Sequence, residues 1–199
     1  SNIDKLFIVV STNVPKFSTY LLDKFLVLSE INNIEPVIIV TKLDICEKDE
    51  KREVKQAIKY YKKLGYKVYT NNQIRKIKRE MKGCVVSLAG QTGAGKSTLL
   101  NRVNKNLNLK IGEVSEHLGR GKHTTRLVEL IQFGDSLVAD TPGFSSLELD
   151  ESLERISSGF IEFGFNCKYS SCTHVKNDGC SVIERVNNGR ILKSRYESY

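Results

Sequence analysis

No apolar run in this 199-residue sequence is long enough to cross a membrane. The longest runs, at residues 6–10 and 37–40, have the length of single β-strands. A secretory leader is also lacking, because no charged segment followed by an apolar one opens the chain. The only methionine is Met81, so we expect the native start to precede Ser1. These absences indicate a cytoplasmic protein with no membrane partner.

The sequence is strongly basic, with a formal net charge of +8. Basic residues crowd into three segments, at 48–63, 75–82 and 102–126. Such clusters suit a polyanionic partner such as RNA. Solvated helix faces explain the first two clusters equally well, since apolar residues recur between the lysines at helical spacing. Charge alone therefore leaves both interpretations open.

Apolar periodicity predicts alternating strands and helices over the first half of the chain. Strands are expected at residues 6–10, 37–40, 66–69 and 84–89, and helices at 17–30, 47–64, 72–82 and from 96 onward. This α/β alternation predicts a mostly parallel sheet with helices on both faces.

The remainder of the chain divides into a hairpin and a different kind of module. Strands are expected at 127–133 and 136–140, and the Gly134-Asp135 pair between them favours an antiparallel edge. Beyond Gly143 we expect a polar helix at 151–163, a cysteine-rich loop and a charged C-terminal stretch. We therefore predict two domains, residues 1–149 and 150–199.

A phosphate-binding loop is expected where the fourth strand meets its helix. The pattern GxxxxGK[ST] has meaning only between a strand and a helix, which is the context found here. In such a loop Lys96 neutralises the outer phosphates and the Ser97 hydroxyl ligates Mg²⁺, while backbone amides surround the phosphates. The predicted nucleotide-binding residues of this loop are Gly90, Gln91, Thr92, Gly93, Ala94, Gly95, Lys96, Ser97 and Thr98.

Two further tetrapeptides point to a guanine nucleotide. At the end of one strand, Asp140 can hold Mg²⁺ while the Gly143 amide faces the terminal phosphate. At the end of another strand, Asp44 can accept both ring-edge hydrogens of guanine. Adenine has no such donor pair, so a buried carboxylate would be left unpaired against ATP. The predicted guanine motif comprises Thr41, Lys42, Leu43 and Asp44.

The order of these motifs is circularly permuted. In an ordinary small GTPase the phosphate loop comes first, whereas here Asp44 precedes Lys96, which precedes Asp140. Cutting the ordinary chain before its fourth strand, and joining its last helix to its first strand, reproduces this order. Such a permutation is tolerated because the termini of a domain commonly lie close together.

With that order, the chain resembles the circularly permuted, small-ribosomal-subunit-dependent GTPase A family, RsgA (also YjeQ). The resemblance runs from residue 3 to about residue 196. It rests on TKLD, AGQTGAGKST, the segment at 119–125, DTPGF and the terminal cysteine pattern.

The resemblance implies GTP hydrolysis during late maturation of the small ribosomal subunit, stimulated by that particle. The implied partners are the subunit and its rRNA, the implied cofactors are GTP or GDP, Mg²⁺ and Zn²⁺, and the chain itself is expected to be a monomer. The N-terminal OB-fold barrel that the family usually carries is expected to be absent from this chain, because the sequence begins at the first strand of the GTPase domain.

The resemblance also assigns catalytic roles around the family's switch I segment. Thr124 or Thr125 is expected to reach Mg²⁺ when GTP is bound. Phe144 stands where a Gln orients the attacking water in Ras-like proteins, so intrinsic turnover is expected to be slow. Either His123 or a partner must then place the water; the alternative for His123 is a surface residue that contacts RNA or solvent. We take His123 and Lys96 as the candidate catalytic residues.

Three cysteines and one histidine form a candidate metal site. Without a secretory signal, five cysteines argue against a disulfide framework and leave metal ligation as the alternative. Three thiolates and one imidazole are the ligand set of a closed structural zinc site, and the spacing matches the zinc loop of the resembled family. The predicted ligands are Cys167, Cys172, His174 and Cys180.

Two other functions compete with this interpretation. One is a non-enzymatic, nucleotide-gated RNA-binding module with incidental hydrolysis. The other is a permuted GTPase of large-subunit assembly, which the cysteine pattern disfavours. The guanine motif also departs from the commoner form, since Thr41 stands where Asn is usual and a shorter hydroxyl must brace the base.

Overall fold

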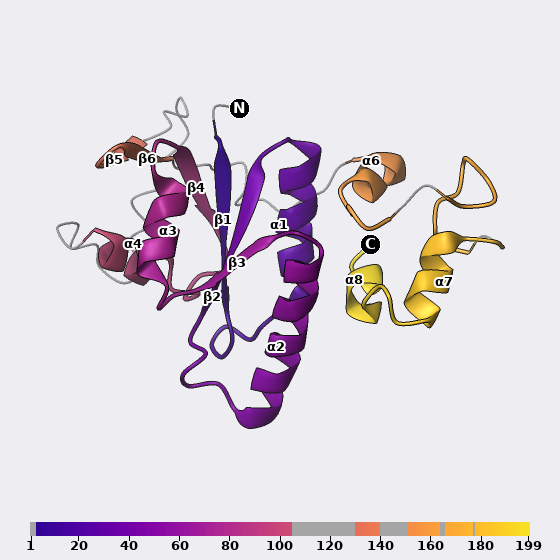
Figure 1. Ribbon diagram of the computed structural model, residues 1–199, viewed down its shortest axis with the longest axis horizontal. Coiled ribbons are helices and arrows are strands. Elements are labelled where there is room, and N and C mark those ends of the chain that lie inside the picture. The colour runs from indigo at the N-terminus through magenta and orange to yellow at the C-terminus, as the bar shows by residue number, and fades with distance from the viewer. Residues whose placement is uncertain (1–2, 105–129, 140–150, 164–165, 177) are drawn as a thin grey trace. The chain divides into compact units, whose positions relative to one another are not determined.

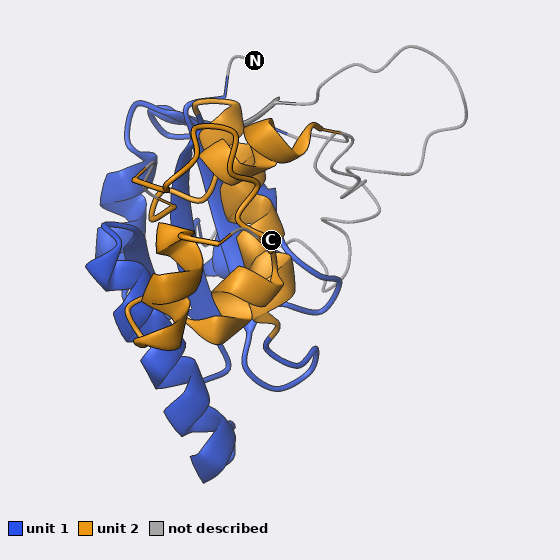
Figure 2. Cartoon of the chain, turned by 90° about the vertical axis from the view of Figure 1, so that its right-hand side faces the viewer, with its two compact units in different colours: residues 1–17, 34–146 blue, residues 18–33, 147–199 orange. Residues whose placement is uncertain are grey.

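The computed structural model describes residues 3–104, 130–139, 151–163, 166–176 and 178–199 (Figure 1). The chain forms two compact units, distinguished by colour in Figure 2. Unit 1 comprises residues 1–17 and 34–146, and unit 2 comprises residues 18–33 and 147–199. In the described part of the chain, no helix has the length and apolar character needed to cross a bilayer.

Unit 1 is built on a six-stranded sheet in the order β3-β2-β1-β4-β6-β5. Every neighbouring pair is parallel except β5 and β6, which form the predicted antiparallel hairpin at the edge. The prediction of a mixed, mostly parallel α/β sheet is therefore confirmed. The strands are β1 (Lys5–Ser11), β2 (Glu35–Thr41), β3 (Lys67–Thr70), β4 (Val85–Ala89), β5 (Leu130–Phe133) and β6 (Ser136–Ala139).

The helices of unit 1 among its described residues are α2 (Lys48–Lys63), α3 (Ile74–Met81) and α4 (Lys96–Val103). Central strands β1 and β2 are buried at all positions but their first, as expected for parallel strands that are covered on both faces. Apolar side chains of α3 and α4 join those of the sheet in one core cluster. This core fixes the ends of β1, β2 and β4, from which the candidate nucleotide loops emerge.

Glu80 of α3 is the centre of a polar cluster on β1 and β3. Its carboxylate accepts hydrogen bonds at 2.8 Å from Lys5, Lys67 and Tyr69. Burial alone would raise the pKa of Glu80, but these donors outweigh it and lower the pKa from 4.5 to about 2. The charged form of Glu80 is therefore the one that the folded state stabilises.

Glu80→Gln is expected to lower the free energy of unfolding at pH 7 by about 1–2 kcal/mol, because a charged acceptor is replaced by a neutral one. Since the folded-state pKa is depressed, the stabilisation is present above about pH 4.5 and is lost as the pH falls toward 2. Urea unfolding between pH 3 and pH 7 measures this, with exposed Glu53→Gln on α2 as control. Stability curves for Glu80→Gln and the wild type that stay parallel over this range would contradict the assignment.

Unit 2 gathers one N-terminal helix with the C-terminal segment. Its helices are α1 (Thr19–Ile31), α6 (Leu153–Ser158), α7 (Ser181–Asn187) and α8 (Lys193–Glu197). Its core is a separate cluster formed by Val27, Phe160, Phe163, Cys180, Val182 and Ile191. The domain boundary expected at residue 149 stays a prediction. Helix α1, although it is near the N-terminus in sequence, belongs to the same compact unit as the C-terminal residues.

The polar helix of unit 2 is shorter than the predicted span of 151–163. α6 ends at Ser158, and Gly159 caps it. A Cβ at Gly159 would lie 2.7 Å from Val27 Cγ1, so α1 approaches the backbone there too closely for a larger residue. Phe160 and Phe163 then stack with ring centroids 4.7 Å apart. Close packing against α1 thus explains why a glycine stands at the end of this helix.

A buried arginine joins distant parts of unit 2. Arg195 is 0% exposed and its Nη1 lies 2.7 Å from Asp23 Oδ1 of α1. Its Nε donates to Glu162 Oε1 at 2.8 Å, and its guanidinium carbon lies 4.3 Å from the Phe160 ring centroid. Asp23 and Arg195 are 172 residues apart in sequence. Pairing keeps these charges tolerable in the core, because an unpaired buried charge is strongly destabilising.

Candidate functional site

The phosphate-loop sequence lies between β4 and α4, in the predicted context. Gly90 has φ of 137°, and a Cβ there would lie 2.2 Å from the Val9 carbonyl oxygen, so only glycine fits. Gly93 and Gly95 also have positive φ, at 80° and 98°. Backbone turns of this kind form concave nests of amides that suit anions. The loop therefore has the glycine-dependent turns in which such nests occur.

Lys96 folds over the loop that it follows. Its Nζ donates to the carbonyl oxygens of Gly90 at 2.6 Å and Gln91 at 3.0 Å. Burial lowers the pKa of Lys96 below its ordinary value. Ser97, in the first turn of α4, is buried with 7% exposure. The roles expected of these two residues, a phosphate-neutralising ammonium and a hydroxyl ligand for Mg²⁺, stay predictions.

The guanine motif is joined directly to the phosphate loop. Thr41 Oγ1 donates to the Ala94 carbonyl oxygen at 2.7 Å, across 53 residues of sequence. Lys42 Nζ donates to the Gly93 carbonyl oxygen at 2.9 Å. The structure thus brings the two motifs into one site despite their inverted order in the chain.

Asp44 is exposed. It lies in a tight turn in which the Ile45 amide donates to the Lys42 carbonyl at 3.3 Å, and Lys42 has φ of 62°. The Asp44 carboxylate is therefore exposed to solvent in this turn. Discrimination against adenine requires the carboxylate to be removed from water, so a bound base has to cover it. Leu43, in the same turn, is half-buried.

The loop after β1 belongs to the same site, and sequence analysis missed it. The Thr12 hydroxyl donates to the Lys42 carbonyl at 2.8 Å, and the Asn13 side chain donates to the Ile45 carbonyl at 3.1 Å. Lys42 Nζ also donates to the Val14 carbonyl. A signal was available, because polar residues 11–13 follow a buried strand at the same sheet edge as the other two loops.

Thr41→Val is expected to weaken GTP and GDP binding by about 10-fold, since the Ala94 carbonyl loses a buried donor and an unsatisfied group costs about 1–3 kcal/mol. Fluorescence titration with labelled nucleotides measures the affinities. Thr41→Ser keeps the hydroxyl and is the matched control, expected to bind within a few-fold of the wild type. Equal affinities for Thr41→Val and the wild type would show that this hydrogen bond does not support the site.

Several predicted site residues lie outside the described residues. They are His123, Thr124, Thr125, Asp140, Gly143 and Phe144. The strand that precedes Asp140 in sequence, β6, pairs in parallel with β4, which leads into the phosphate loop. The roles assigned to these residues stay predictions.

The four predicted metal ligands come together in unit 2. Their ligand atoms all lie within 4.8 Å of one another. The His174 Nδ1 atom is 3.5 Å from the sulfurs of both Cys167 and Cys180, which are 3.9 Å apart. A tetrahedral zinc site with Zn–S of about 2.3 Å and Zn–N of about 2.05 Å requires S···N of about 3.6 Å and S···S of about 3.8 Å. The donor set therefore fits zinc in both chemistry and spacing.

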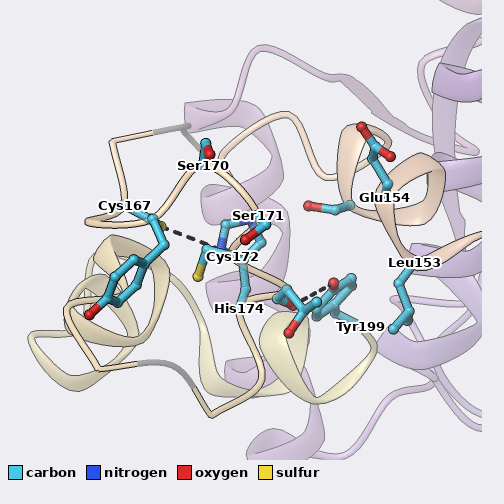
Figure 3. A pocket seen from close by; sticks show the side chains of 11 residues that line it. Leu153, Glu154, Cys167, Ser170, Ser171, Cys172, His174 and Tyr199 are labelled. Atoms are coloured by element: carbon cyan, nitrogen blue, oxygen red, sulfur yellow. Dashed lines mark hydrogen bonds between the residues drawn. The ribbon is translucent and has the colours of Figure 1, made fainter.

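Aromatic residues of the C-terminus hold the loop that carries these ligands. Tyr196 OH donates to the His174 carbonyl at 2.7 Å, and Tyr199 OH donates to the Thr173 carbonyl at 2.7 Å. Burial lowers the pKa of His174, which favours the neutral imidazole that a metal binds. Cys167, Cys172, His174 and Tyr199 border one hollow of about 490 Å³ (Figure 3).

Comparison with known proteins gives a consistent set of relatives. The family model of the RsgA GTPase matches residues 1–150. The chain is 45% identical to a small ribosomal subunit biogenesis GTPase RsgA of Halalkalibacterium halodurans, covering 100% of this chain and 71% of that protein. A protein of the same name from Geobacillus sp. (strain WCH70) is 44% identical with the same coverage.

Two solved structures share the architecture. YjeQ from Thermotoga maritima has a TM-score of 0.84 and 37% identity, covering 100% of this chain and 69% of that one. YloQ, a circularly permuted GTPase, has a TM-score of 0.79 and 36% identity, covering 100% of this chain and 66% of that one. The permuted order inferred from Asp44, Lys96 and Asp140 is thus found in a protein of the same fold.

Proposed function

Because the chain belongs to the RsgA GTPase family, we propose that it hydrolyses GTP during late maturation of the small ribosomal subunit and that the subunit stimulates this hydrolysis. GTP hydrolysis, with GTP or GDP and Mg²⁺ as its ligands, follows from the family itself. The subunit comes from the names of the relatives. Such a factor acts in the cytoplasm, where ribosomes are assembled, and we propose that it does so as a monomer.

The observation that carries this proposal is the pair of hydrogen bonds from Thr41 to Ala94 and from Lys42 to Gly93. They hold the base-binding turn against the phosphate loop, as a single guanine nucleotide requires. In phosphoryl transfer the protein mainly positions groups and stabilises charge. Lys96 would neutralise the outer phosphates, and the loop amides would bind their oxygens.

Mg²⁺, when bound, neutralises charge that develops on the β- and γ-phosphates. Ser97 supplies a buried hydroxyl at the start of α4 that would hold the ion. We propose Asp140 and Thr125 as its further partners, and the Gly143 amide as a donor to the terminal phosphate. Thr124 is the alternative to Thr125.

We propose His123 as the residue that places the attacking water, since Phe144 can neither donate nor accept a hydrogen bond. His123→Ala is expected to reduce subunit-stimulated hydrolysis by about 10²-fold or more while GTP affinity stays unchanged. Phosphate release with and without purified small subunits measures this and also tests the proposed function. The control is Lys76→Ala on α3. His174→Ala would be unsuitable as a control, because it changes the candidate metal cluster.

The results separate the possible functions. Unchanged stimulated turnover in His123→Ala would remove this residue from the mechanism. No stimulation of the wild type by small subunits would instead favour the nucleotide-gated RNA-binding module, whose hydrolysis is incidental. Stimulation by large subunits alone would favour a factor of large-subunit assembly.

For the cysteine cluster we propose a structural zinc ion held by Cys167, Cys172, His174 and Cys180. Four protein ligands leave no position open for a substrate or a water, so the ion would stabilise the loop rather than act on GTP. The spacing of the donor atoms supports this assignment. We accordingly propose residues 150–199 as a zinc-binding module that follows a GTPase domain at 1–149.

A further inference from the structure

Helix α2 carries a strictly segregated row of positive charge. With about 100° between successive residues, its seven basic side chains fall within an arc of about 120°. The buried residues Val54, Ala57 and Tyr61 lie on the opposite side, and the acidic residues Asp49, Glu50 and Glu53 lie outside the arc. The basic row consists of Lys48, Lys51, Arg52, Lys55, Lys59, Lys62 and Lys63.

The basic row is accessible and has no acidic partner in the described residues. Six of its members are exposed and Lys51 is half-buried. Among the ion pairs of the described part of the chain, none involves a residue of this row. A shallow hollow of about 480 Å³ follows the row, lined by Lys48, Lys51, Arg52, Lys55, Gln56 and Lys59.

The density of charge matches that of a nucleic-acid strand. From Lys48 to Lys63 the helix rises about 22 Å, which gives about one cation per 3 Å. One strand of a duplex carries about one phosphate per 3.4 Å of axis. An ordinary solvated helix face mixes both signs of charge, whereas this one excludes acidic residues from the whole arc.

We propose that the basic row of α2 binds the phosphate backbone of RNA. A membrane surface fits less well, because a helix that lies in a bilayer presents apolar side chains next to its basic ones. Here Val54, Ala57 and Tyr61 of α2 are buried on the side opposite the row, and the arc contains no apolar side chain. The choice of RNA over DNA rests on the proposed function. The recognition of phosphates rests only on the charge and exposure of the basic row.

The test compares two triple variants of the 199-residue chain with the same change in charge. Arg52, Lys55 and Lys59 on α2 are replaced together by Gln, and Arg75, Lys76 and Lys78 on α3 are replaced in the same way. All six side chains are exposed, so Gln is expected to preserve both helices. Binding to a labelled 20-base-pair RNA hairpin is measured by anisotropy across a salt series, beside vesicles containing phosphatidylserine.

We expect the α2 variant to bind the hairpin at least 10-fold more weakly and its salt slope to fall by about 2–3, because three phosphate contacts are lost. The α3 variant is expected to stay within 3-fold of the wild type. Equal losses in both variants, no loss in the α2 variant, or tighter binding to the vesicles than to RNA would each overturn the proposal. Basal GTP hydrolysis is measured in parallel: its absence would refute the proposed function while leaving the RNA comparison interpretable.

Discussion

Replacing Lys96 with alanine is expected to lower kcat/KM for GTP hydrolysis by about 10²–10³-fold, the range found when one preorganised donor to a developing charge is removed. Lys96 Nζ is fixed at the phosphate loop by the carbonyls of Gly90 and Gln91, so its charge is already in position when a nucleotide arrives. Its burial makes the electrostatic loss larger than in water. Phosphate release over a range of GTP concentrations that extends below KM measures the effect.

The control for Lys96→Ala is Lys76→Ala on α3, which removes the same charge from an exposed position. It is expected to leave turnover unchanged. Nucleotide affinity is measured alongside, because Lys96 contributes to binding before the chemical step. Turnover at the wild-type rate in Lys96→Ala, with the sheet intact by circular dichroism, would show that the phosphate loop is not the catalytic centre.

The sheet of unit 1 could be predicted because its strands have an unambiguous pattern. β2 was expected at residues 37–40 and spans Glu35–Thr41, since a continuous apolar run closed by polar residues is typical of a strand buried on both faces. The hairpin followed from Gly134-Asp135, and Gly134 has the positive φ of 60° that this turn needs. The residue types within each segment were therefore enough to predict this strand and the hairpin.

The packing of unit 2 could not be predicted, because periodicity identifies a helix and not its neighbour. The apolar run in α1 gave the helix near residues 17–30, but its helical partners in unit 2, α6 and α8, are more than 120 residues away. The buried Asp23–Arg195 pair is a long-range contact of this kind. A lone Asp within the apolar stretch of α1 was the available hint that a buried cation had to pair with it.

The sequence was enough to identify the residues of the candidate site, but it predicted their arrangement only in part. The motifs identified Thr41, Lys42 and Lys96, and the strand ends explain why Thr41 and Lys42 contact the loop that precedes Lys96. Thr41 was expected to brace the base, yet its hydroxyl braces the phosphate loop through Ala94. Asp44 is exposed in a turn where Lys42 has a positive φ, a backbone property that the residue type does not disclose.

The largest effect on stability is expected at the cysteine cluster. The described residues between 166 and 180 form no helix or strand, and His174 has φ of 61°, which is unusual for a non-glycine residue. Such a loop has little backbone pairing of its own, so the proposed zinc ion would supply much of its order. Cys180→Ser is expected to lower zinc content from about one ion per chain to almost none, because a closed site needs all four ligands.

Cys84→Ser is the matched control, since Cys84 lies beside β4, outside the cysteine cluster, and its thiol donates to the Lys82 carbonyl at 3.6 Å. Hydrogen exchange separates the two units: in Cys180→Ser, α7 and α8 are expected to lose protection while β1 and α4 keep theirs. Chelation of the wild type should reproduce this pattern, because the same ligands hold the ion. If Cys180→Ser retained one zinc per chain or full protection of α7, the four-ligand site would be wrong, and the order of this loop would have to come from Tyr196 and Tyr199 alone.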